Sequence, residues 1–199
     1  MTKISIVAFD DFTDIDVWLM WDLLNRVQAK DWQVRIIAEN KEVVSSTGIK
    51  FKVHGALNKA SESDAVLFAS GKGTRRLIKD EEFLKALNLN PERQLIGSMC
   101  SGALILAALK LLDGKKATTY PTVKTQLESF GVEVIEKPFV QQGNVATAAG
   151  CLSAQYLCGW VIETLAGKEE KEKVLSYIQP VGEGLFFADY ETKATAQVG

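Results

Sequence analysis

The sequence predicts a doubly wound α/β sandwich, because short apolar runs of strand length alternate with longer helical patterns along almost the whole chain. The runs lack strict alternation of apolar and polar residues, which is typical of parallel strands covered by helices on both faces. We therefore expect a mostly parallel sheet between two helical layers. The predicted strands are Lys3–Phe9, Trp32–Ala38, Asp64–Ala69 and Gln94–Met99, and the predicted helices are Thr13–Gln28, Arg75–Leu87, Ser101–Leu111 and Leu152–Leu165.

Smaller elements fill the segments between these runs. Glu42–Val53 is typical of a β-hairpin that turns at Thr47 and Gly48. Val132–Ile135 and Val145–Ala148 are predicted to be short strands, and the charged run Lys168–Lys173 to be the solvated start of a last helix. There is no repeat, linker or low-complexity segment, so residues 1–199 are expected to form a single domain.

Composition and charge indicate a cytoplasmic protein that acts on a small molecule. The formal net charge of −2 provides no basic surface for nucleic acid or an anionic membrane. No run approaches the ~20 apolar residues that cross a bilayer. The first apolar stretch leads into Asp10 and Asp11 without a small-residue cleavage site, which favours a core strand over a signal peptide. No metal-ligand spacing or cofactor motif is present, so neither is expected.

Cys100 is the strongest candidate for a reactive group. It follows a predicted strand, precedes a predicted helix, and has Ser98 and Gly102 two residues away on either side. A nucleophile elbow needs small residues there, because the strained turn brings neighbouring backbone too close for larger side chains. The helix N-terminus would favour the thiolate and lower the pKa of Cys100. The alternative is a structural cysteine, since free cysteines are often buried.

The other two cysteines and the single histidine are weaker candidates. Cys151 also precedes a helical run, but core packing is favoured for it, and Cys158 lies within that run. The two lie roughly 10 Å apart if they share a helix, too far for a disulfide, so reduced thiols are expected. His54 ends a predicted hairpin strand, and a surface position is favoured over a role as the base for Cys100.

Asp16 is the better partner for the thiol. It interrupts the apolar run Ile15–Trp21 just after the first predicted strand. A carboxylate among apolar side chains has a raised pKa and can donate or exchange a proton. The alternative is local, because Thr13 and Asp16 also fit a helix cap with an acidic residue three places on. A capping acid would face its own backbone, whereas a functional one would face Cys100.

A glycine-rich loop follows the third predicted strand. Ser70 and Gly71 begin this loop, and its backbone amides could stabilise a developing negative charge. It matches neither nucleotide-binding glycine pattern, which disfavours phosphate binding. An ordinary strand-to-helix turn is the alternative.

These features, in this order, resemble the DJ-1/PfpI superfamily over nearly the whole chain. The matching residues are Asp16 after the first strand, Ser70 and Gly71 in the loop, and Cys100 at the elbow. The segment from Cys100 to Thr119 is particularly similar to the isocyanide hydratase branch, which also has aspartate at the first position. The resemblance implies a flavodoxin-like sandwich and a homodimer.

The resemblance also implies chemistry. In the hydratases the cysteine attacks an isocyanide carbon to form a thioimidate, and water then releases an N-formamide. Cys100 would be the nucleophile and Asp16 the acid/base. Ser70, Gly71, Ser101, Thr119 and Tyr120 would line the substrate and oxyanion site.

The sequence departs from the family pattern at several of these positions. Ser101 replaces the threonine of the hydratases and the histidine of PfpI-type peptidases, which disfavours a peptidase. Tyr120 stands where a histidine often follows the threonine pair, and Ala69 begins a loop that is Pro-Gly-Gly in the hydratases. Two other functions stay open: a DJ-1-like glyoxalase acting on α-oxoaldehydes, and a non-enzymatic redox sensor whose thiol is oxidised selectively.

Overall fold

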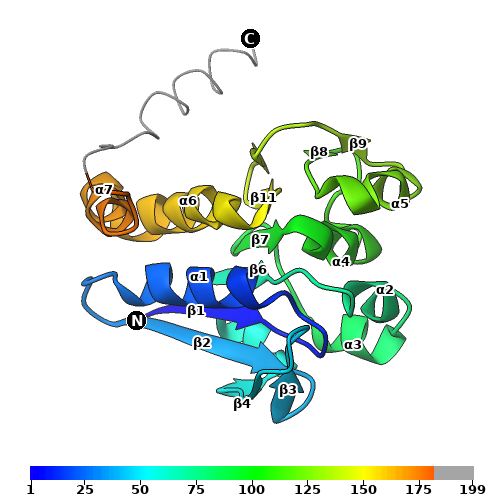
Figure 1. Cartoon of the computed structure of the whole chain (residues 1–199), viewed down its shortest axis with the longest axis horizontal. Coiled ribbons are helices and arrows are strands. Elements are labelled where there is room, and N and C mark those ends of the chain that lie inside the picture. Colours follow the sequence, from blue (N-terminus) through cyan, green and yellow to red (C-terminus); the bar gives the residue numbers. More distant parts are fainter. Residues whose placement is uncertain (182–199) are drawn as a thin grey trace.

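A computed structural model describes residues 1–181 and shows a seven-stranded sheet at the centre of the fold (Figure 1). The strand order is β10-β11-β7-β6-β1-β2-β5, and every pairing is parallel except that of β10 with β11. The predicted doubly wound α/β class is therefore confirmed. The strands of this sheet are β1 (Thr2–Val7), β2 (Trp32–Ala38), β5 (Gly55–Ala56), β6 (Ala65–Phe68), β7 (Leu95–Met99), β10 (Phe139–Gln142) and β11 (Val145–Ala148).

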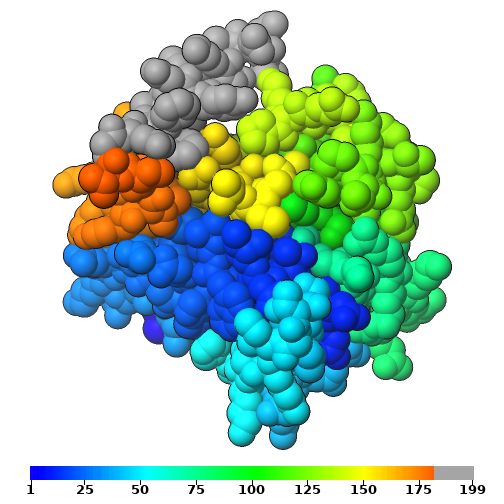
Figure 2. Space-filling view, viewed as in Figure 1, coloured from blue at the N-terminus to red at the C-terminus, as the bar shows by residue number. Residues whose placement is uncertain are grey.

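Two short ribbons and the helices complete the described fold. The antiparallel hairpin of β3 (Glu42–Val44) and β4 (Lys50–Lys52) is where the sequence predicts it, and it stands out from the body of the molecule in Figure 2. Strands β8 (Lys116–Ala117) and β9 (Glu133–Val134) form a small parallel pair. The helices are α1 (Asp14–Asn25), α2 (Thr74–Leu77), α3 (Glu81–Ala86), α4 (Ala103–Ala108), α5 (Lys124–Glu128), α6 (Ala154–Ala166) and α7 (Lys168–Ser176). Short 3-10 helices span residues 57–62, 100–102, 121–123 and 151–153.

The helices form two layers because the crossovers between parallel strands are right-handed. Helix α1 packs beside α6, and α6 beside α7, on one face of the sheet (Figure 1). The crossovers through α2, α3 and α4 run in the opposite direction along the sheet and so cover the other face. Strands β6 and β7 are buried along their full length between these layers, which explains their continuous apolar sequences.

One helix prediction is wrong in its extent. The sequence predicts a single helix over Arg75–Leu87, but the chain forms α2 and α3 with a break between them. Asp80 lies at this break, and its carboxylate accepts a hydrogen bond of 3.0 Å from the Phe83 N–H. This side-chain cap satisfies a free amide at the start of α3, so a new helix begins where a continuous one is expected.

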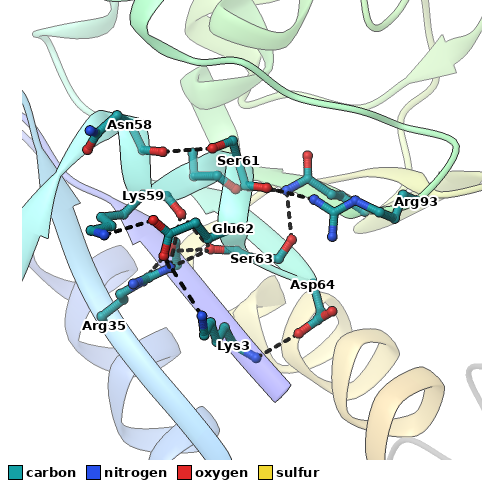
Figure 3. Close-up of polar contacts among 12 residues, drawn as sticks. Lys3, Arg35, Asn58, Lys59, Ser61, Glu62, Ser63, Asp64 and Arg93 are labelled. Carbon is teal, nitrogen blue, oxygen red and sulfur yellow. Dashed lines mark hydrogen bonds and ion pairs between the residues drawn. The ribbon is translucent and has the colours of Figure 1, made fainter. Parts of the chain in front are cut away.

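A polar cluster closes the amino-terminal end of the central strands (Figure 3). The Arg35 guanidinium donates to the hydroxyl of Ser5 and to the backbone oxygen of Lys59, at 3.1 and 3.0 Å. The same side chain contacts the hydroxyl of Ser63 and the carboxylate of Glu62. These groups bond to one another and lie at the sheet end opposite to Cys100, so we assign them a structural role.

Gln94 connects this cluster to β7, and its replacement by methionine should destabilise the fold. The buried Gln94 amide donates to the backbone oxygens of Ala60 and Ser63, both at 2.7 Å. Methionine has a similar volume, but it removes the Gln94 partner of the Ser63 oxygen and of the Asn90 N–H, which donates to Gln94 Oε1 at 2.7 Å. We expect this loss to cost about 3 kcal/mol of unfolding free energy. Chemical denaturation measures this free energy of unfolding. Gln33→Met, at an exposed position of β2, should change the free energy of unfolding by less than about 0.5 kcal/mol. Equal effects of the two substitutions would contradict the structural role of Gln94.

No helix among residues 1–181 is both long and apolar enough to span a bilayer.

Candidate active site

Four strand-to-helix connections meet at the carboxyl edge of the sheet. They follow β1, β6, β7 and β11, which are adjacent in the sheet and parallel. Parallel strands bring the turns after them to one edge, where open α/β sheets form their ligand crevices. These connections carry, in turn, Asp16, the loop at Ser70 and Gly71, Cys100, and Cys151.

Cys100 lies at a strained turn between β7 and α4. Its φ angle is +43°, a left-handed conformation that is uncommon for a residue with a side chain. The turn is packed tightly, since a Cβ added to Gly102 would lie 2.7 Å from the backbone oxygen of Ala69. Only a residue without a side chain fits there, which is the physical reason for the small flanking residues seen in the sequence. The Cys100 side chain is 5% exposed.

Asp16 lies in the first turn of α1 and is completely buried. Neither of its carboxylate oxygens has a hydrogen-bond partner of normal geometry among the described residues. The capping interpretation is wrong, because the Thr13 side chain makes no capping bond and the Thr13 N–H donates to the backbone oxygen of Ser70 at 2.8 Å. Burial raises the pKa of Asp16, and the nearby Ser70, Cys151 and Cys100 only partly oppose this rise.

Cys151 is the site residue that the sequence analysis missed. One carboxylate oxygen of Asp16 and the sulfurs of Cys100 and Cys151 all lie within 4.8 Å of one another. Cys151 is only partly buried, so the prediction that it packs in the core is wrong. The available signal was its position after a strand and a glycine: both cysteines begin a 3-10 turn that leads into a helix.

The pKa of Cys100 is raised, contrary to the expectation that the helix N-terminus lowers it. Burial is the largest cause, followed by the negative charges of Asp16 and Cys151. The backbone N–H of Gly150 favours the thiolate but does not offset these effects. Burial and Asp16 likewise raise the pKa of Cys151 to about 11. Acidic groups in contact in a low-dielectric site disfavour one another's ionised forms, so both thiols keep their protons at neutral pH.

The glycine loop is joined to the elbow by one hydroxyl group. Ser101 Oγ accepts a hydrogen bond from the Gly71 N–H at 3.0 Å and donates to the Gly71 oxygen at 3.2 Å. A Cβ on Gly71, whose φ is +145°, would lie 2.2 Å from the backbone oxygen of Asp11. The Gly71 amide is therefore occupied by Ser101, and its use by an oxyanion stays a prediction that requires this bond to open.

Thr119 and Tyr120 differ in their relation to the elbow. Thr119 Oγ1 donates to the backbone oxygen of Cys100 at 2.8 Å, so this residue helps to hold the turn. The Tyr120 side chain is 48% exposed, and its approach to substrate stays a prediction.

His54 makes its contacts elsewhere. Its Nδ1 accepts a hydrogen bond from the Ile36 N–H at 3.0 Å, and its ring stacks on Trp21 with the ring centroids 4.9 Å apart. This nitrogen is already used by the backbone, so His54 is not available there as a base. Cys158 is completely buried in α6 and is surrounded by the core.

The Asp16, Cys100 and Cys151 group could also hold a metal ion. Two sulfurs and a carboxylate oxygen are a donor set that suits zinc. No second group of this kind is found in residues 1–181. A bound metal would occupy the Cys100 sulfur, so metal binding and nucleophilic chemistry at this thiol would exclude each other.

Comparison with known proteins identifies the family that this chain matches. The sequence model of the DJ-1/PfpI family matches residues 2–164, which include Asp16, the glycine loop, the elbow and Cys151. The chain belongs to the DJ-1/PfpI family. The elbow and the acid of this DJ-1/PfpI chain therefore lie within the part that the family shares.

Two relatives and one solved structure illustrate the range of the family. An isonitrile hydratase of Pseudomonas putida is 27% identical over 150 residues, which cover 74% of this chain and 65% of the hydratase, so the match leaves about a third of that relative uncovered. A glutathione-independent glyoxalase DJ-1 of Schizosaccharomyces pombe is 24% identical over 87% of this chain and 96% of its own length. A THiJ/PfpI family protein of Pseudomonas syringae has a TM-score of 0.81, with 23% identity over 90% of this chain and 76% of its own, and shows the same fold.

Proposed function

We propose that this protein is a cysteine-dependent isocyanide hydratase-like enzyme that converts a small isocyanide to an N-formamide. Cys100 is the nucleophile, and Asp16 carries the proton. The observation that carries the proposal is the Asp16 carboxyl group, which is fully buried, without a hydrogen-bond partner in residues 1–181, and within 4.8 Å of the Cys100 sulfur. Burial raises the pKa of this carboxyl group, which brings it closer to neutral pH and suits a group that takes up and returns a proton.

The first half-reaction adds the thiol across the terminal carbon of the isocyanide. The Cys100 proton passes to Asp16 as the sulfur attacks this carbon, and Asp16 then gives the proton to the same carbon. The product is a thioimidate, R–N=CH–S–Cys100. An uncharged, largely apolar substrate suits a buried site whose two thiols keep their protons at rest, since the substrate brings no charge that has to be desolvated on binding.

The second half-reaction consumes one water molecule. Asp16 takes a proton from water as the water oxygen attacks the thioimidate carbon, and Asp16 then gives this proton to the nitrogen. The hydroxyl proton then returns through Asp16 to the sulfur as the C–S bond breaks and the carbonyl forms. The products are R–NH–CHO and the free Cys100 thiol, so atoms balance with isocyanide and water as the only reactants.

A second candidate is a glyoxalase that acts on small α-oxoaldehydes. The supporting observation is the relative of that name in Schizosaccharomyces pombe, which this chain matches over 96% of the relative's length. The reaction would also begin with addition of Cys100, here to an aldehyde carbon, and would end in a 2-hydroxy acid. Asp16 would move the proton between the two carbons.

Side-by-side incubation with an alkyl isocyanide and an α-oxoaldehyde separates the two candidates. We expect formamide from the first substrate, followed by NMR, at a much higher rate than 2-hydroxy acid from the second. The reverse preference would favour the glyoxalase, and turnover of neither would reject both. The homodimer implied by the family resemblance stays a prediction, which size-exclusion chromatography with light scattering tests. The cytoplasmic location indicated by the composition also stays a prediction.

A further inference from the structure

We propose that Cys100 and Cys151 form an intramolecular disulfide when the protein meets hydrogen peroxide, and that the peroxide reacts first at Cys151. The proposal does not depend on the hydratase activity, because it concerns the pair of thiols and not the substrate.

The backbone brings the two cysteines together at one sheet edge. β7 and β11 are parallel neighbours, with Met99 opposite Ala148. Cys100 follows Met99 directly, and Cys151 comes three residues after Ala148. Neighbouring strands lie about 4.8 Å apart, so the turns that follow them begin close together. The two sulfurs already lie within 4.8 Å of each other, so a bond of about 2.05 Å requires a further approach of less than about 3 Å.

The backbone beside Cys151 is less tightly packed than the turn at Cys100. Gly150, directly before Cys151, has a φ of +87°, and the nearest atom to an added Cβ there is 3.9 Å away. Leu152, directly after it, is 69% exposed. The Cys100 turn, by contrast, is held by Gly102 against backbone and by Thr119. Closure of the disulfide therefore moves Cys151 towards Cys100.

Exposure favours Cys151 as the first thiol to react. It is partly buried, whereas Cys100 is 5% exposed. Peroxide has to reach a sulfur before the thiolate can attack it, so the more accessible thiol of the pair reacts first. Cys158 lies within α6 and is completely buried, so it does not share this access.

The chemistry balances with peroxide as the oxidant. The Cys151 thiolate attacks one peroxide oxygen, the O–O bond breaks, and a sulfenic acid and hydroxide form, which a proton converts to water. Cys100 then gives its proton to Asp16 and attacks the Cys151 sulfur. The S–O bond breaks, and the leaving hydroxide takes that proton to form the second water. Overall, two thiols and one peroxide give one disulfide and two water molecules.

The consequence is a reversible block of the candidate active site. The disulfide removes the nucleophile from the carboxyl edge of the sheet, and thiol reductants restore it. It also keeps Cys100 from irreversible oxidation to the sulfonic acid, because its sulfur is no longer a free thiol.

Peptide mapping of the full chain after treatment with mild peroxide tests whether Cys100 and Cys151 form a disulfide. We expect a cross-linked peptide that contains Cys100 and Cys151, an intact mass lower by two hydrogens, and full reversal by dithiothreitol. Cys158→Ala should behave as the wild type, and either Cys100→Ala or Cys151→Ala should lose the cross-link. A cross-link to Cys158, or oxygen addition at Cys100 without any cross-link, would overturn the proposal.

A sulfenic acid trap such as dimedone tests the order of reaction. In Cys100→Ala we expect the label on Cys151, formed at least about tenfold faster than the label on Cys100 in Cys151→Ala. Equal or faster labelling of Cys100 would overturn the order. Thermal unfolding of each variant shows whether it is folded, and the wild-type cross-link map does not depend on any variant. Isocyanide turnover is not needed for either readout, so failure of the proposed function leaves this test intact.

Discussion

Replacement of Cys100 with alanine is expected to lower isocyanide turnover by at least about 10³-fold. The thiol is the group that forms the covalent thioimidate, and no other nucleophile of the described chain takes its place in the same geometry: Cys151 lies on the adjacent strand's turn, and Cys158 is enclosed in the core. Loss of a nucleophile typically removes most of the rate enhancement while binding is retained. Formamide release, followed by NMR at saturating substrate, measures the turnover of the variant and of the wild type.

Cys158→Ala is the matched control for this substitution. It removes a thiol of the same kind from a position that does not contact the site, and its turnover should stay within about twofold of the wild type, provided that circular dichroism shows the native fold. In the wild type, rapid quenching during turnover should yield an intact mass increased by that of the substrate. Undiminished formamide production by Cys100→Ala would remove this residue from the mechanism.

The exchange of Asp16 for asparagine should lower turnover by about 10²–10⁴-fold. Asparagine has nearly the same shape but cannot take a proton from the Cys100 thiol or return it. Because the Cys100 pKa is raised by burial and by its acidic neighbours, the thiol needs this base to become nucleophilic at neutral pH. The loss should appear in kcat more than in KM, since proton transfer belongs to the reaction steps.

The same exchange should stabilise the protein, and more so at higher pH. The pKa of Asp16 is raised in the folded state, so the wild type loses stability as pH rises from the unfolded value of about 3.9 through the folded value. Asparagine stays neutral and does not incur this loss. Its advantage in unfolding free energy should therefore be small near pH 4 and grow by about 1.4 kcal/mol for each unit by which the folded pKa is raised. Denaturant titrations at pH 4 and pH 8 measure it.

Asp22→Asn supplies the control on the same helix. Asp22 is exposed and pairs with Arg26, an interaction worth about 0–1 kcal/mol at a protein surface. This variant should keep wild-type turnover and show no gain in stability from pH 4 to pH 8. If Asp16→Asn behaved in the same way as Asp22→Asn, Asp16 would not carry the proton in the reaction, and its burial would not lower the unfolding free energy.

Prediction from the sequence succeeded where local pattern and local structure coincide. The limits of β2 and β11 agree with the predicted ranges, and β6 and β7 differ from them by one residue at most at each end, because buried parallel strands need continuous apolar residues. The helix predicted over Arg75–Leu87 failed because apolar spacing does not reveal a cap such as that of Asp80. Short edge pairings such as β5 with β2 were missed, since so few residues carry no periodic signal.

The candidate site was predicted unevenly for a related reason. Cys100 and Asp16 were found because each breaks a local pattern, a cysteine among small residues at a strand end and an acid in an apolar run. Cys151 was assigned to the core because its position after a strand and a glycine is a weaker signal than the small residues around Cys100, and free cysteines are often buried. The pKa direction of Cys100 was wrong for the same reason: the helix N-terminus is visible in sequence, but the acid and the second thiol beside it are not.

Apolar periodicity and the space that a tight turn allows were therefore enough to predict the alternation of strands and helices, the parallel sheet, and the elbow at Cys100. Which side chains meet at that elbow depends on the order of the strands in the sheet. The strand order places β11 beside β7 and β6 beside β1, and this order, which no local pattern encodes, brings Asp16 and Cys151 to the same thiol. Burial among these neighbours then sets the protonation of Cys100.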